Sequence, residues 1–141
     1  MRAGGSEQRL SAASPDPDDR YFTMEGKEVF WHAVQRMAES ARTTLGSAGL
    51  TVEDVDWLVG HQANSRILRS LAGELGIPSG RSLTNIDRVG NTAAASIPLA
   101  LADAHAEGRL RAGQRVLLTA FGGGLTWGSA LLTWPDIECV P

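Results

Sequence analysis

The sequence predicts one α/β domain with a mostly parallel sheet, helices on the faces of that sheet and an antiparallel last strand. Apolar patterns typical of helices and of strands alternate along the chain, as they do in proteins built on parallel sheets. The last two strand patterns are separated only by Gly122, Gly123 and Gly124, so these two strands must be antiparallel. A chain of 141 residues has the length of a single domain.

The chain begins with a segment that differs from the rest. Residues 1–20 are rich in Gly, Ser, Ala, Pro and Asp and have few apolar side chains to offset the entropy of ordering, so we expect a flexible arm. Residues 21–141 form the predicted domain. From Met24, apolar residues recur every three or four positions, which predicts an amphipathic helix that ends near Gly46 or Gly49.

The remaining elements follow from local patterns and from glycine and proline positions. Asn64 or Ser65 is expected to cap the second helix, and Gly76 and Pro78 to end it. Pro98 is tolerable in the third helix because it falls in the first turns. The predicted segments are a strand at 54–59, a helix to 75, a weak strand at 81–85, a polar loop at 87–91, a small-residue helix at 92–106, and strands at 115–121 and 125–134.

Composition excludes several classes of protein. The chain has a formal net charge of −3, whereas a nucleic-acid-binding protein usually has an excess of basic residues. The charge therefore argues against a nucleic-acid-binding protein. No apolar run approaches the length of a membrane span, and no secretory leader is recognisable, so we expect a cytoplasmic protein. The single cysteine, Cys139, follows two acidic residues that disfavour a thiolate, and the three histidines show no metal-ligand spacing.

Polar loops follow three of the predicted strands and are expected to meet at one edge of the sheet. His61 follows the first strand, Asn91 ends the loop after the weak strand, and the three glycines follow the next strand. A neutral imidazole and a side-chain amide can each donate a hydrogen bond, and glycines can bring bare backbone N–H groups close to a substrate. Such donors around one point describe an oxyanion hole for a thioester or ester.

Each of these residues also has an ordinary structural interpretation. His61 could be a satisfied histidine at a strand end. Asn91 could be only a helix cap, because asparagine often precedes helices. Three glycines between two strands are usually only a turn. The residue pattern by itself therefore leaves open whether this edge of the sheet is an acyl-transfer site.

Three long motifs, in this order, resemble the C-terminal half of β-ketoacyl-acyl carrier protein synthase III, the condensing enzyme that initiates type II fatty acid synthesis. The resemblance extends from about residue 21 to residue 134. The motifs are His-Gln-Ala-Asn-Ser-Arg-Ile at 61–67, Asn-Ile-Asp-Arg-Val-Gly-Asn-Thr-Ala-Ala-Ala-Ser-Ile-Pro-Leu-Ala-Leu at 85–101, and Ala-Phe-Gly-Gly-Gly-Leu-Thr-Trp-Gly-Ser-Ala at 120–130.

The resemblance implies half of a thiolase-like fold, with a mixed sheet in the order 3-2-4-5, strand 1 missing and strand 5 antiparallel. It implies that His61 and Asn91 belong to a Cys-His-Asn triad. In this family they bind the malonyl thioester carbonyl and stabilise the enolate formed when carbon dioxide leaves. The implied substrates are acyl-CoA and malonyl-acyl carrier protein, with no cofactor and no metal. The full-length family is homodimeric.

The resemblance also assigns positions around the triad. Gly123 is the expected backbone donor of the oxyanion hole. Arg66 matches a basic position that favours the acidic carrier protein, and Arg69 could reinforce it from the same helix face. Trp31 stands at a position where basic residues occur in the family, so the basic patch for the carrier protein is thinner here. The channel for coenzyme A or pantetheine and the malonyl site is expected to include Gly26, Ala63, Asn64, Ile67 and Phe121.

One departure from the family is central. The nucleophilic cysteine belongs to the N-terminal half, which this sequence lacks, and Cys139 lies outside every matching motif. We therefore expect a fragment or split piece that is inactive in condensation alone, because no residue can take the acyl group. Two alternatives stay open: a related acyltransferase or condensing enzyme of polyketide or natural-product biosynthesis, and a non-catalytic partner or relic domain.

Overall fold

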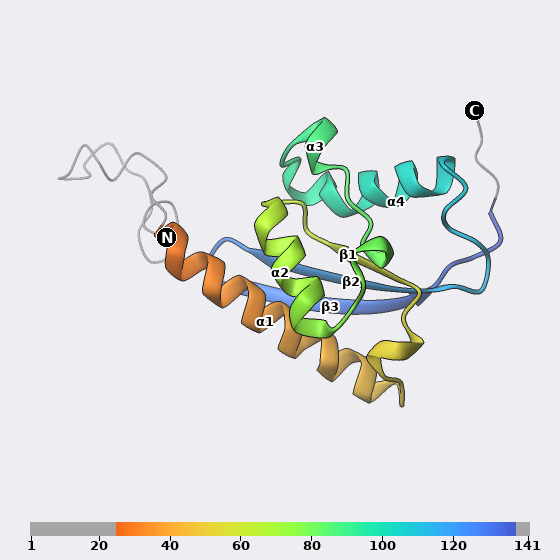
Figure 1. Ribbon diagram of the computed structural model, residues 1–141, viewed down its shortest axis with the longest axis horizontal. Coiled ribbons are helices and arrows are strands. Elements are labelled where there is room, and N and C mark those ends of the chain that lie inside the picture. Colours follow the sequence, from red (N-terminus) through yellow and green to blue (C-terminus); the bar gives the residue numbers. More distant parts are fainter. Residues whose placement is uncertain (1–24, 138–141) are drawn as a thin grey trace.

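The computed structural model describes residues 25–137, and its centre is a three-stranded mixed sheet (Figure 1). The order is β1-β2-β3, with β1 parallel to β2 and β2 antiparallel to β3. This confirms the predicted mixed sheet with an antiparallel last strand. The predictions for the arm at 1–20 and for Cys139 lie outside the described residues. The strands are β1 Trp57–Gly60, β2 Arg115–Gly122 and β3 Thr126–Thr133.

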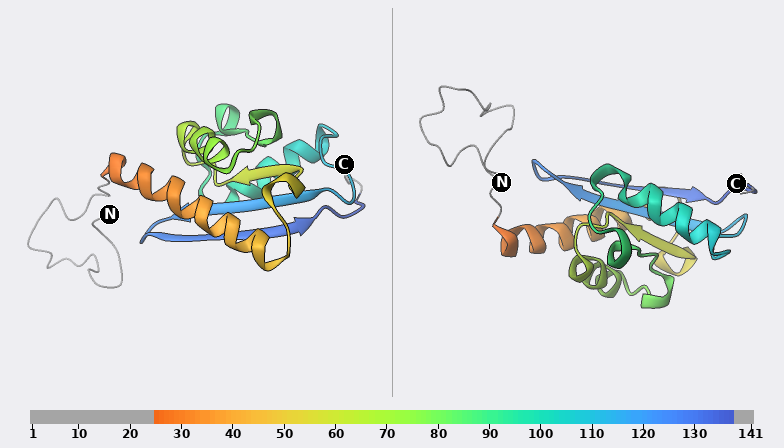
Figure 2. Two further views of the ribbon diagram at one scale, coloured as in Figure 1. Left: turned by 60° about the horizontal axis from the view of Figure 1, so that its bottom comes forward. Right: turned by 90° about the horizontal axis from the view of Figure 1, so that it is seen from above.

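Helices cover both faces of the sheet (Figures 1 and 2). The helices α1 (Gly26–Ser47) and α2 (Ser65–Leu75) pack together over one face, and α4 (Ser96–Ala106) covers the other. Alternation along β2 serves both cores, because Leu117 and Phe121 pack with α1 and α2 while Val116 packs with α4. The two cores hold the ends of β1 and β2 in fixed positions.

The predicted weak strand at 81–85 is wrong in extent. The 3₁₀ turn Ser79–Arg81 occupies its start, and only Ser82 forms an isolated parallel bridge, to Leu58. Leu83 N–H then donates to Leu58 O at 2.9 Å, and the chain leaves the sheet to bury the Leu83 side chain. The segment still lies beside β1, on the side opposite β2, which is the neighbour order that was expected.

Three other boundaries differ from the prediction. The first strand begins at Trp57 because Thr51 and Asp54 close a capping box around the 3₁₀ turn Val52–Asp54. The predicted loop at 87–91 contains a single helical turn, α3, at Ile86–Val89. The third helix begins late: residues Ala93–Ala95 form a 3₁₀ turn, and α4 starts only at Ser96. Ala93 has a φ of 50°, which a regular α-helix cannot include.

The predicted ends of α2 are confirmed. The Asn64 side chain accepts a hydrogen bond from Arg66 N–H at 2.9 Å, as an N-cap should. Gly76 ends the helix in the left-handed conformation with a φ of 73°. The Asn64 cap fixes where α2 starts relative to β1, and therefore where the short 61–64 connection lies.

Gly60, the last residue of β1, lets α2 approach the sheet. A Cβ atom at this position would lie 2.5 Å from Leu68 Cδ2 and 3.6 Å from Met37 Cε. Both neighbours are buried side chains of helices that cover this face. A larger residue would therefore push α2 away from the strand that carries His61.

Gly60→Ala is expected to lower the free energy of unfolding by about 1–3 kcal/mol, the usual cost of overpacking a core. Gly73→Ala is the matched control, because Gly73 lies inside α2 with nothing within 4 Å of its Cβ position. That control should gain about 0.5–1 kcal/mol from helix propensity. Urea denaturation of both variants measures the difference, and equal stabilities would contradict the close approach at Gly60.

Candidate active site

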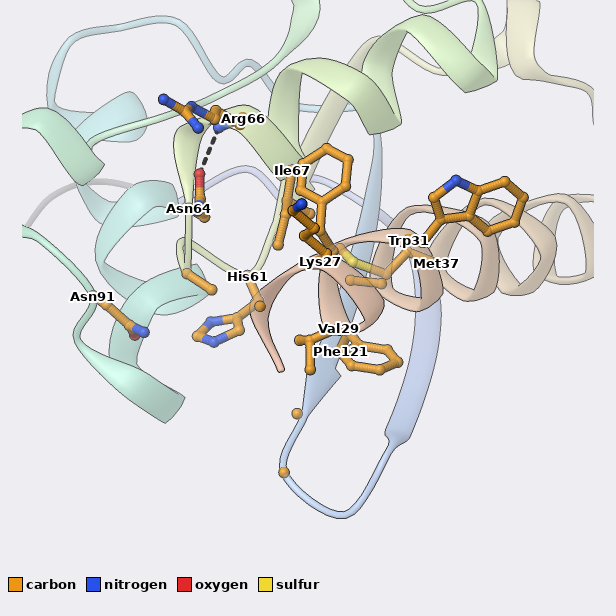
Figure 3. Close-up of a pocket in the computed structure, with 16 residues that line it drawn as sticks. Lys27, Val29, Trp31, Met37, His61, Asn64, Arg66, Ile67, Asn91 and Phe121 are labelled. Atoms are coloured by element: carbon orange, nitrogen blue, oxygen red, sulfur yellow. Dashed lines mark hydrogen bonds between the residues drawn. The ribbon is translucent and has the colours of Figure 1, made fainter. Parts of the chain in front are cut away.

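A pocket of about 1050 Å³ opens at the carboxyl ends of β1 and β2 (Figure 3). Its walls are the first turns of α1, the connection after β1, the loop after α3 and the end of β2. The lining is largely apolar, with a few polar groups at one end. Every predicted site residue except Arg69 lines it: Gly26, His61, Ala63, Asn64, Arg66, Ile67, Asn91, Phe121 and Gly123.

His61 is placed by hydrogen bonds on both its backbone and its ring. Its N–H donates to Thr119 O at 2.9 Å, which continues the parallel ladder by one residue. Its Nδ1 atom lies 2.6 Å from Ser96 Oγ. The ring is half-buried, and this burial lowers the pKa of the imidazole because desolvation disfavours the charged form. A neutral imidazole at this position has one N–H to donate.

The lowered pKa of His61 makes stability depend on pH. Between the depressed folded pKa and the ordinary imidazole value of about 6.5, the unfolded chain binds more protons than the folded chain. The free energy of unfolding should therefore fall as pH falls below about 6.5. Denaturation of the chain and of His61→Gln across this range measures the effect, and identical pH slopes would contradict it.

Asn91 lies in the loop after α3, with its side chain held in one orientation. Its Oδ1 accepts a hydrogen bond from Ala93 N–H at 2.9 Å. This contact uses the carbonyl end of the amide and leaves the NH₂ end as a donor. In Figure 3 the Asn91 amide and the His61 ring face each other at one end of the pocket. Asn91 can therefore accept the Ala93 N–H through its carbonyl oxygen and still donate a hydrogen bond into the pocket through its NH₂ group.

Gln62, next to His61, faces the protein interior. Its side chain is fully buried, and Nε2 donates to Gly60 O at 2.8 Å and to Leu83 O at 3.3 Å. Its Oε1 accepts from Asn85 N–H at 3.2 Å. Gln62 therefore ties the end of β1 to the segment that leads to α3, and it takes no part in the pocket surface.

The glycine turn connects β2 to β3 beside the pocket. Gly123 O accepts a hydrogen bond from the Thr126 hydroxyl at 3.0 Å. Gly124 and Leu125 have positive φ values of 74° and 53°. The rings of Phe121 and Trp127 stack with centroids 6.3 Å apart, which supports the pocket wall from the far side of the turn. Gly123 thus lines the pocket from a turn whose shape is fixed by its neighbours.

The opposite end of the pocket is formed by the start of α1 and by α2. Trp31, on α1, is 67% exposed at this end (Figure 3). Arg66 lies beside Asn64, at the start of α2. Arg69 is placed elsewhere: it lines a separate groove between α2 and the segment that follows it. The two arginines therefore line different hollows, and their joint role in docking the carrier protein stays a prediction.

Sequence reasoning missed two features of this site. Ser96, which contacts His61, carries no local signal, because the sequence pattern places it inside the small-residue helix predicted at 92–106. The apolar periodicity of the first helix, which includes Phe30 and Met37, indicated only a core-facing surface, although these residues and Val29 also line the pocket. Only the packing of α1 against the ends of the strands reveals this second role.

Two further findings concern the part of the chain at residues 25–137. No group of three or more His, Cys, Asp or Glu side chains in that range is placed to hold a metal ion. None of the helices in the same range combines the length and the apolar character that a bilayer span requires.

Comparison with solved structures defines the class as thiolase-like α/β condensing enzymes. The 3-oxoacyl-(acyl carrier protein) synthase III of Pseudomonas aeruginosa matches with a TM-score of 0.82 and 51% identity, over 84% of this chain and 38% of that protein. The priming β-ketosynthase of the R1128 polyketide pathway matches with a TM-score of 0.74 and 39% identity, over 81% of this chain and 34% of that protein.

The family model for the 3-oxoacyl-[acyl-carrier-protein] synthase III C terminal matches residues 45–134. The chain belongs to this family. A β-ketoacyl-[acyl-carrier-protein] synthase III of Streptomyces coelicolor is 66% identical over 138 residues, which are 98% of this chain and 41% of that relative. The chain therefore spans about two-fifths of the length of the relatives it matches, and the resemblance seen in the sequence motifs is confirmed.

Proposed function

We propose that this chain is the histidine- and asparagine-bearing part of a β-ketoacyl-acyl carrier protein synthase III that condenses an acyl-CoA with malonyl-acyl carrier protein. One observation carries the proposal: a neutral histidine and an oriented amide donor, His61 and Asn91, face each other at one end of a largely apolar pocket. Two N–H donors in a partly dry site suit an oxygen that gains negative charge.

In the proposed reaction the malonyl thioester carbonyl accepts hydrogen bonds from His61 and Asn91. The bond to the malonyl carboxylate breaks, carbon dioxide leaves, and the electron pair forms an enolate whose oxygen these donors stabilise. The enolate carbon then attacks an acyl thioester on a cysteine and expels the cysteine thiolate. Neither donor needs to change its protonation state in the decarboxylation step.

The nucleophile must come from elsewhere, since no cysteine lies in residues 25–137. We propose that a cysteine-bearing N-terminal half completes the site and that the assembled enzyme is a homodimer. The pocket has space for such a partner, because its volume is about 1050 Å³. The long, largely apolar space between His61 and Trp31 has room for a pantetheine arm, with Gly26, Ala63 and Ile67 along it.

The carrier protein is proposed to dock at the end of the pocket that carries Arg66. Arg66 and Lys27 are exposed cations at this rim, and they suit an acidic partner. Arg69 would contribute only if the docked protein extends across α2 to the neighbouring groove.

The likeness to a priming β-ketosynthase of a polyketide pathway favours a second candidate, a condensing enzyme of natural-product biosynthesis. Both candidates use the same site and differ in the acyl primer. The primer pocket is expected to be shaped largely by the other half of the fold. Profiling a reconstituted enzyme with short straight, branched and aromatic acyl-CoA substrates separates the two.

Reconstitution tests the proposal. The chain is mixed with the part of the Streptomyces coelicolor relative that precedes the matched segment, and carbon dioxide release and ketoacyl product are measured. Activity is expected from the mixture and from neither part alone. The control is the same mixture with the partner's cysteines changed to alanine. Condensation by the chain alone would contradict the need for a second half, and failure to form a complex would favour a relic domain.

A further inference from the structure

Ser96, the first residue of α4, joins the site through a contact that the proposed reaction does not use directly. Its side chain is 1% exposed. Its Oγ lies 2.6 Å from His61 Nδ1 and 3.2 Å from Gln62 N. The hydroxyl therefore lies between the backbone after β1 and the side chain of the histidine.

These two contacts differ in what they allow. The Gln62 N–H can only donate, so Ser96 Oγ accepts that hydrogen bond. The hydroxyl proton then needs an acceptor, because a buried hydroxyl without one is costly. Among the contacts formed within residues 25–137, His61 Nδ1 is the acceptor within reach of Ser96 Oγ. A protonated Nδ1 would leave the hydroxyl proton unpaired.

We propose that Ser96 is a positioning residue that fixes His61 in the tautomer with a bare Nδ1 and a protonated Nε2. The hydroxyl donates to Nδ1 and accepts from Gln62 N–H. The imidazole then presents Nε2–H, a donor, to the pocket. The catalytic consequence rests on the proposed function, whereas the tautomer itself does not.

The tautomer decides whether His61 can assist an enolate. With Nε2 protonated, the ring donates to an oxygen that becomes negative. With Nδ1 protonated, Nε2 would present a lone pair to that oxygen and repel it. Ser96 thus connects the start of α4, which follows the Asn91 loop and the 3₁₀ turn Ala93–Ala95, to the hydrogen-bonding state of the histidine that follows β1.

The tautomer is measured without substrate by long-range ¹H–¹⁵N correlation spectra of the 141-residue chain, above the pKa of His61. His61 signals are assigned by their loss in His61→Gln. We expect the chemical shift of an unprotonated nitrogen on Nδ1 and of a protonated nitrogen on Nε2. Ser96→Ala should shift both nitrogens toward the values of a tautomer mixture, and Ser96→Thr should restore them.

Two variants make the test specific. Ser96→Thr keeps the hydroxyl, and Ser96 borders a hollow of about 450 Å³ beside the main pocket. Ser129→Ala is the control, because it removes a part-buried hydroxyl that donates to Thr119 Oγ1 at 2.9 Å and does not contact His61. A protonated Nδ1 in the unsubstituted chain would overturn the proposal, even if Ser96→Ala fails to fold. So would an unchanged spectrum in a folded Ser96→Ala chain.

Activity provides a second readout. In the reconstituted enzyme, Ser96→Ala should lower kcat for malonyl decarboxylation about tenfold, the factor expected for one hydrogen bond, with little change in KM. Ser96→Thr should recover most of the rate. An unchanged kcat in Ser96→Ala would overturn the catalytic consequence. If no mixture is active, the proposed function fails, while the spectra still decide the tautomer.

Discussion

His61→Ala is expected to lower the rate of malonyl decarboxylation by the reconstituted enzyme roughly 10²–10³-fold, the usual cost of removing one oxyanion-hole donor. The ring is neutral because burial lowers its pKa, so its loss removes a hydrogen-bond donor and leaves no unpaired charge behind. The effect should appear mainly in kcat, because the donor acts on an oxygen that becomes charged only as the carboxylate leaves.

Asn91→Ala should have an effect of similar size, and the double variant should be little worse than either single one. Both donors serve one oxygen, and residues that act as a unit are strongly non-additive. His32→Ala is the matched control, since His32 is an exposed histidine on α1 and does not line the pocket. Rates within twofold of the unsubstituted enzyme for His61→Ala would contradict the assignment, as would independent, multiplicative effects of the two substitutions.

The order of helices and strands was predictable because each local pattern agreed with the packing. The three-glycine connection forced β3 to be antiparallel, and Asn64 and Gly76 marked the ends of α2. The predicted element boundaries were wrong where tertiary contacts overrode the local preference of the sequence. The segment at 81–85 has strand-like residues, but burial of Leu83 and the contact from Gln62 to Leu83 O draw it out of the sheet after a single bridge.

The site was predictable where it rests on motifs and unpredictable where it rests on packing. His61 and Asn91 stand out as polar residues after strand and loop patterns, and the structure places both at one pocket. Ser96 is 35 residues away from His61 in the sequence and falls inside the predicted helix at 92–106, where a serine has no special significance. Arg69 lies three residues after Arg66 on α2 but lines a different groove, so its expected contribution beside Arg66 stays a prediction.

Gln62→Met is expected to lower the free energy of unfolding by about 2–4 kcal/mol, the largest stability effect among the variants considered. Methionine matches glutamine in length and volume, so the change removes hydrogen bonds with little change in packing. It leaves the N–H of Asn85 buried without a partner, because that residue is 1% exposed and donates to Gln62 Oε1. Gly60 O and Leu83 O lose their side-chain donor as well.

The loss should also reach the Asn91 loop. Asn85 O accepts the N–H groups of Arg88 and Val89 at 3.0 and 3.1 Å and so starts α3, the turn that leads to Asn91. Urea denaturation should show the lower stability, and hydrogen exchange should show faster opening at the amides of Arg88 and Val89. Gln35→Met, at an exposed position of α1, is the matched control and should stay within about 0.5 kcal/mol of the unsubstituted chain. If the Gln62→Met chain were as stable as this control, the buried Gln62 amide would not be what connects the end of β1 to the segment that leads to α3 and Asn91.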